Sequence, residues 1–160
     1  MFAGLSTMTW IHTLLSLVGI ASGMVVVKGL LSSQPMGGWS ALFLASAVLT
    51  SVTGFLLPSA GFGPSHWVGV ISLVLLAFAL LARYGLHLSG AWRWIYAVGV
   101  VLSLYFLFFV LVAQFFAKIP ALHALAPTQS EPPFAVAEGM LLVLFVILTV
   151  VAAVKFRPAA

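Results

Sequence analysis

The sequence predicts an all-α bundle of five helices that cross a lipid bilayer, and three observations support this fold class. Apolar residues make up 64% of the 160 residues and charged residues 5%, whereas a soluble domain carries roughly 25% charged residues. The mean hydropathy is +1.28. Five apolar segments each have the length of about 20 residues that a helix needs to cross the hydrocarbon core. A chain of this length has room for one such domain, residues 1–160.

Turn-forming residues separate the five segments. The predicted helices cover about 9–31, 39–57, 65–84, 91–117 and 134–155. Glycines lie in the first three connections and prolines in the first two, and a longer outer loop, residues 118–133, precedes the last helix. Within that loop we expect a short interfacial helix near 120–126. The run Ser130-Glu131-Pro132-Pro133 is typical of a helix start, with Ser130 as the N-cap.

The charged residues sort to two sides of the predicted bundle. With five crossings, one face carries five of the six cations, namely Lys28, Arg83, Arg93, Lys155 and Arg157. The other face carries Lys118 beside Glu131 and Glu138. The positive-inside rule then predicts a cytoplasmic C-terminus and an N-terminus outside. All five tryptophans fall at predicted helix starts, where their rings favour the headgroup level: Trp10, Trp39, Trp67, Trp92 and Trp94.

Small residues form stripes along the predicted helices. Lipid supplies no hydrophobic drive between helices, so close backbone packing at small residues has to hold the bundle together. Gly19 and Gly23 have the small-xxx-small spacing on the first helix. Similar stripes occur on the next three helices: Ser46, Thr50, Thr53 and Gly54, then Gly69 and Ser72, then Gly99 and Ser103. We expect these residues to line helix contacts.

Polar groups gather at the outer end of four predicted helices. His12, His66, Gln114 and Glu138 lie at similar depth on different helices, and Lys118 and His123 come from the outer loop. His12 and His66 are candidate axial ligands of a haem b, and with His123 and Glu138 they are candidate ligands of Zn or Cu. Alternatively, each side chain reaches the headgroup region, or the cluster orders the outer loop. We expect these groups to converge near the membrane boundary.

Glu138 has two further interpretations. An ionisable group inside a membrane is costly and marks a functional site by default, so Glu138 is a candidate proton carrier of a transporter. It also lies near a predicted helix start, where an acid is favoured, and it could pair with Lys118 or a protonated histidine.

The composition excludes several classes of chemistry. The chain has no cysteine, which excludes disulfide and thiolate chemistry, and it has no aspartate, nucleophile with an adjacent base or phosphate-binding loop. The net charge of +4 comes from cations that lie singly near the ends of the apolar segments, where they mark membrane topology. We therefore expect no nucleic-acid partner. The leading interpretation is an accessory subunit, not an enzyme by itself, that binds a ligand, metal or membrane-protein partner at its periplasmic end. The alternatives are a b-type haem protein that exchanges electrons with quinone, and a small proton-coupled transporter.

Three stretches of the sequence resemble those of known proteins. They are TSVTGF at 50–55, ARYGLHLSGAWRWIY at 82–96 and APTQSEPPF at 126–134. Together they resemble a group of small bacterial inner-membrane proteins of unassigned activity, over nearly the whole chain. The resemblance implies the bacterial inner membrane as the compartment, and it carries over no catalytic residue.

The charge pattern gives a test of orientation. Reporter fusions after Ala60 and after Gln129 should read periplasmic, and fusions after Gly37 and after Ser89 should read cytoplasmic, because the cation-rich connections stay inside. A periplasmic reporter signal after Ser89 would contradict the predicted orientation.

Overall fold

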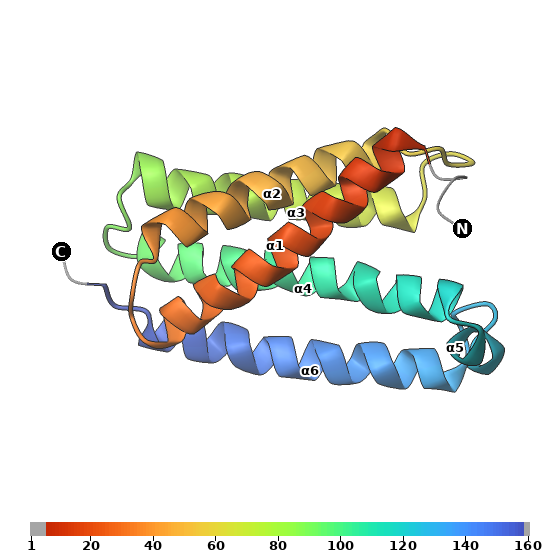
Figure 1. Cartoon of the computed structure of the whole chain (residues 1–160). Coiled ribbons are helices and arrows are strands. Elements are labelled where there is room, and N and C mark those ends of the chain that lie inside the picture. Colours follow the sequence, from red (N-terminus) through yellow and green to blue (C-terminus); the bar gives the residue numbers. More distant parts are fainter. Residues whose placement is uncertain (1–5, 159–160) are drawn as a thin grey trace.

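A computed structural model describes residues 6–158, of which 80% are helical and none is in a β-strand. The helices in chain order are α1 (Thr7–Leu31), α2 (Gly37–Phe55), α3 (Pro64–Leu80), α4 (Trp92–Lys118), α5 (Pro120–Leu125) and α6 (Pro132–Lys155). A single π-helical turn, η1 (Leu81–Gly85), continues α3. Figure 1 shows the long helices running side by side, with α5 as a short cap at one end.

Within residues 6–158, five helices are long and apolar enough to cross a membrane, with α3 and η1 forming one of them. This confirms the predicted number of spans, and each bound lies within two residues of the prediction. The short helix expected in the long loop is present as α5. The predicted N-cap is wrong by one residue, because Glu131 and not Ser130 precedes the first helical residue of α6. The backbone N–H of Ser130 instead donates to the Glu131 carboxylate.

The helix α4 is the centre of the bundle and contacts each of the other membrane-length helices. α1 packs most extensively on α2, and α3 joins α2 and α4. α6 lies on the far side of α4 from α2 and α3 (Figure 1). α1 crosses the bundle obliquely, so that it approaches α6 where both helices end and diverges from it where both begin (Figure 1).

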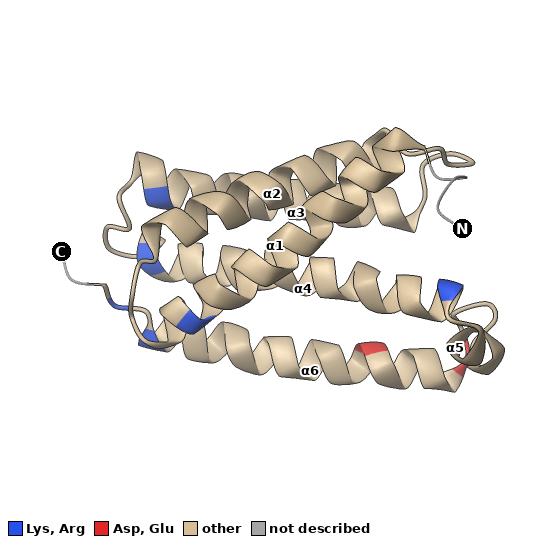
Figure 2. Ribbon diagram, in the orientation of Figure 1, with Lys and Arg blue, Asp and Glu red and all other residues tan. Residues whose placement is uncertain are grey.

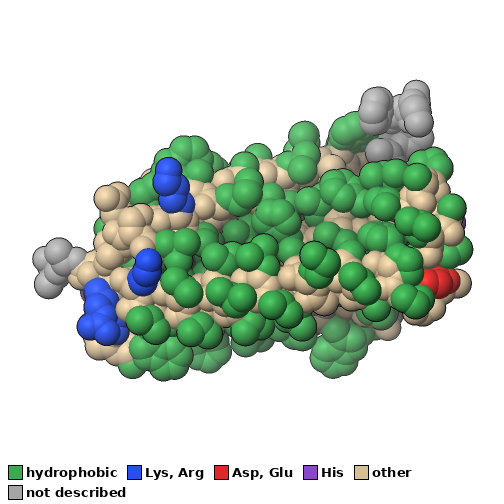
Figure 3. Space-filling model, turned by 90° about the horizontal axis from the view of Figure 1, so that it is seen from below, with side chains coloured by type: hydrophobic (Ala, Val, Ile, Leu, Met, Phe, Trp, Pro, Cys, Tyr) green, Lys and Arg blue, Asp and Glu red, His purple; other side chains and the backbone are tan. Residues whose placement is uncertain are grey.

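The charges mark the two ends of this bundle. We call the end that carries Lys28, Arg83, Arg93, Lys155 and Arg157 the basic end. The opposite end carries Lys118 and Glu131. Figure 2 shows the separation along the helix axes, and Figure 3 shows hydrophobic side chains covering the flank between the ends. The predicted sorting of charges by end is therefore present in the fold.

Small residues allow the closest helix approaches. A Cβ placed on Gly23 of α1 would lie 2.7 Å from Leu104 of α4 and 2.9 Å from Phe43 of α2. A Cβ on Gly99 of α4 would lie 3.1 Å from the carbonyl oxygen of Leu75 in α3. The predicted role of the glycine stripes in packing is confirmed at these positions, where an added side chain would require its neighbours to shift.

Packing is uneven along the bundle. The buried residues of α1 all lie between Gly19 and Leu30, in the half nearer the basic end. Those of α4 lie between Tyr96 and Leu104, apart from Phe116. The bundle is thus tightly packed toward the basic end and more loosely packed toward the opposite end.

The contact at Gly23 gives a test of packing. Gly23→Leu should lower the stability in detergent by about 1–3 kcal/mol, the usual scale of an overpacked contact. Gly139→Leu is the matched control, because a Cβ on Gly139 would meet nothing within 4 Å. Thermal unfolding followed by circular dichroism measures both. Equal midpoints for the two variants would show that the Gly23 contact does not hold α1 in place.

Candidate functional site

His12 joins α1 to α2. Its Nδ1 atom lies 3.0 Å from the Thr53 hydroxyl oxygen of α2. The single Thr53 hydroxyl hydrogen points to the Leu49 carbonyl oxygen at 2.7 Å, so the N–H at Nδ1 of His12 is the donor to Thr53. Gly54 gives the imidazole room, since a Cβ there would lie 3.4 Å from Cε1 of His12. The side chain therefore forms a hydrogen bond between two helices.

His66 caps the start of α3. Its Nδ1 atom accepts the backbone N–H of Gly63 at 3.1 Å, and its Nε2 atom lies 3.4 Å from the Ser59 hydroxyl. The imidazole stacks on Phe62, with ring centroids 5.0 Å apart, and tilts against Phe55 at 5.6 Å. Both ring nitrogens thus have partners in the turn that precedes α3, and His66 acts as a capping residue there.

The geometry does not support the haem and metal hypotheses. The hydrogen-bond partner of His12 is Thr53 of α2, whereas His66 bonds within the turn before α3 and packs on Phe55. Both ring nitrogens of His66 have hydrogen-bond partners within the protein. Within residues 6–158, no group of three or more His, Asp or Glu side chains is placed to hold a metal ion. The remaining predicted site residues, Gln114, Lys118 and His123, are exposed.

Glu138 differs from the other polar residues of the predicted site. It is the seventh residue of α6, about 9 Å inside the helix at 1.5 Å per residue. Its side chain is 8% exposed, and neither carboxylate oxygen has a hydrogen-bond partner among the described residues. It interacts electrostatically with Tyr105 of α4. The pairing with Lys118 is not formed.

A buried carboxylate without partners destabilises the folded protein, because no interaction offsets the free energy of removing its charge from water. The side chain therefore holds a proton, or it takes a cation or hydrogen-bond donor from outside the described chain. Glu131, the only other acid of the chain, lies in a different environment outside the spans. Of the residues that the sequence singled out, Glu138 is the one whose polar atoms the fold leaves unsatisfied and buried.

The basic end contains buried interactions that sequence reasoning missed. The Arg83 guanidinium donates to the Tyr96 hydroxyl at 3.1 Å and lies 5.3 Å from the centre of its ring. Arg93 donates to the carbonyl oxygen of Phe156 at 2.6 Å, just beyond α6. The sequence held one indication of the first pair: Arg83 and Tyr96 lie on either side of the short connection between η1 and α4, so their side chains lie at the same end of the bundle. At the basic end, these two hydrogen bonds connect η1 to α4 and connect α4 to the residue after α6.

The opposite end is ordered by the loop before α6. The Glu131 carboxylate accepts hydrogen bonds from the Thr128 hydroxyl at 2.7 Å and from the Ser130 backbone N–H at 3.1 Å. The Gln129 amide donates to the Ala113 carbonyl oxygen of α4 at 2.7 Å. The hydrogen bond from Thr128 is the main reason that the pKa of Glu131 lies below its ordinary value.

Fold and site together define a multi-pass α-helical membrane protein with one unpaired buried acid. Comparison with protein-family models, curated proteins and solved structures finds no match to this chain.

The Glu131 turn predicts a pH dependence. Because its pKa is lowered in the folded protein, the stabilisation from these bonds is present above the unfolded pKa and is lost as the pH falls through the folded pKa. The amide resonances of Thr128 and Ser130 should shift in NMR spectra on acidification, with a midpoint below that of an ordinary glutamate. Glu131→Gln should abolish the shift. A midpoint at or above the ordinary value would contradict the arrangement.

Proposed function

We propose that the protein is a small proton-coupled transporter of the bacterial inner membrane, in which Glu138 binds and releases the proton. The basic end faces the cytoplasm in this proposal, because an excess of Lys and Arg marks cytoplasmic connections. Glu138 then lies in the periplasmic half of the membrane.

The observation that carries the proposal is the unsatisfied carboxyl of Glu138, buried between α6 and α4. A carboxyl used only for structure would have hydrogen-bond partners, as the carboxylate of Glu131 does. A carboxyl that changes its protonation during a cycle needs a closed position in which the neutral form is favoured. It also needs an open position in which water solvates the charged form.

The packing of α6 supports such an opening. Of its most apolar 18-residue stretch, 11% is buried, against 22–44% in the other four spans. α6 contacts mainly α4, and α1 only weakly. Phe116 of α4 and Phe134 of α6 are in contact, with ring centroids 5.4 Å apart, and Phe134 lies four residues before Glu138 on α6. Separation of α6 from α4 at the opposite end would bring water to the carboxyl, while the bond from Arg93 holds the basic end.

Few charges face Glu138 from the helices around it. Tyr105 is the titratable group that reaches it from α4. The ionisable groups of α1 are His12, which bonds to α2, and Lys28, which belongs to the basic end. The protonation of Glu138 is therefore governed by its exposure to water.

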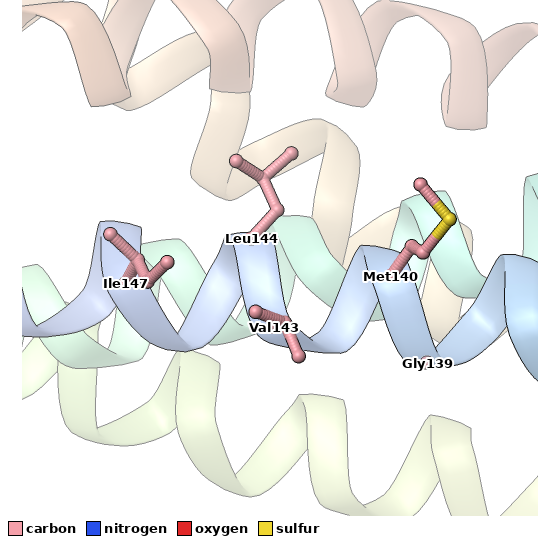
Figure 4. A pocket seen from close by; sticks show the side chains of 5 residues that line it. All are labelled: Gly139, Met140, Val143, Leu144 and Ile147. Carbon is pink, nitrogen blue, oxygen red and sulfur yellow. The ribbon is translucent and has the colours of Figure 1, made fainter.

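A second candidate function is that of an accessory subunit, and the outer face of α6 favours it. Met140, Val143 and Ile147 are 55–69% exposed, and together with Gly139 and Leu144 they line a shallow hollow of about 470 Å³ (Figure 4). Gly139 leaves room for the backbone of a partner helix to approach. Isolation of a stable complex with another membrane protein that Gly139→Leu disrupts would favour this function.

The proposed transport has a direct test. The purified protein is reconstituted in liposomes that contain a pH-sensitive dye, and an inward pH gradient is applied without a co-substrate, so that the dye reports the uncoupled proton flux through the carboxyl of Glu138. The wild type and Glu131→Gln should acidify the lumen, whereas Glu138→Gln should behave like empty liposomes. Infrared difference spectra should contain a protonated-carboxyl band that Glu138→Gln removes and Glu131→Gln keeps. Undiminished proton movement in Glu138→Gln would contradict the proposal.

A further inference from the structure

An apolar groove runs between α1, α4 and α6, away from Glu138 and toward the basic end. It has a volume of about 230 Å³ and is lined by Met24 and Val27 of α1, Leu104 and Phe108 of α4, and four residues of α6 that include Leu148. Phe108 and Phe145 form part of its wall, with ring centroids 5.6 Å apart. The groove has the character of a site for a hydrocarbon chain.

Two lysines continue the helix faces that line this groove. Lys28 is four residues after Met24, which places it on the same face of α1 about 6 Å nearer the basic end. Lys155 is seven residues after Leu148, two turns further along the same face of α6. Both lysines are exposed. The groove therefore has an ammonium group on each flank at its basic end.

The surroundings keep these cations close together and unopposed by acids. The Arg157 backbone N–H donates to the Ser33 hydroxyl at 2.7 Å, so the residues after α6 are joined to the turn after α1. Arg157 adds a third exposed cation there. The two acids of the chain lie elsewhere, Glu131 at the opposite end and Glu138 between α6 and α4.

We infer that the groove and the lysines at its mouth form a binding site for one anionic phospholipid. The phosphate lies between Lys28 and Lys155, and an acyl chain lies along the groove toward Phe108. Basic pockets between membrane helices bind anionic headgroups in this way, each cation contributing near the membrane surface. The apolar lining selects a lipid over a free phosphate ester, because only the lipid has a chain to remove from the bilayer into the groove.

The site is tested by native mass spectrometry of the intact protein released from nanodiscs of equal phosphatidylglycerol and phosphatidylcholine. The wild type should retain phosphatidylglycerol in preference to phosphatidylcholine. Lys28→Gln and Lys155→Gln should each reduce that preference about fivefold, the factor expected for one surface cation. Lys118→Gln, at the opposite end, should leave the preference unchanged.

Two further arms separate this site from general attraction to a basic surface. Met24→Trp fills the groove and should lower lipid retention, whereas Leu14→Trp, an equally exposed position on α1, should not. Glycerol 3-phosphate in excess should fail to displace the lipid. The inference is overturned if Met24→Trp has no effect, if all the lysine variants lose the preference equally, or if glycerol 3-phosphate displaces the lipid completely.

Discussion

At Gly23, α1 lies so close to Phe43 of α2 and Leu104 of α4 that a Cβ on Gly23 would require one of these side chains to shift. Most of the bundle depends on contacts of this kind, because helices in lipid gain no hydrophobic free energy by leaving one apolar medium for another. α1 crosses the bundle obliquely at this contact (Figure 1). That crossing brings His12 to Thr53 and opens the apolar groove between α1 and α6.

The two ends of the bundle differ in how they are held. At the basic end, Arg83 and Arg93 bond to groups that are buried, the Tyr96 hydroxyl and the Phe156 carbonyl oxygen. At the opposite end, the hydrogen bonds around Glu131 lie within the loop itself, and the Gln129 amide is the link to α4. The unsatisfied carboxyl of Glu138 lies in the half of the bundle away from the basic end, where α1 and α4 have few buried residues.

The sequence predicted the spans well, because bilayer thickness and lipid solvent constrain helix length and composition more strongly than any tertiary contact. It also predicted the glycine contacts, which follow from spacing along a single helix. Partners on other helices were harder to predict. His12 could reach Thr53 only through the particular crossing of α1 and α2, and Arg83 lies in the π turn Leu81–Gly85, which no sequence pattern predicted. Nearly every residue of α6 is apolar, so no periodicity showed that Glu138 shares the buried face of Phe145 and Ala152.

The uneven packing has a consequence for how the protein responds to bilayer thickness. Helices adapt to a thinner or thicker membrane chiefly by tilting, and tilting requires freedom from neighbours. α1 has no buried residue before Gly19, whereas its second half is enclosed by α2 and α4. Mismatch is therefore absorbed in the half that contains Glu138, and the half around Phe43 and Tyr96 keeps its shape. Membrane thickness thus acts first on the half of α1 before Gly19, which contains the hydrogen bond between His12 and Thr53.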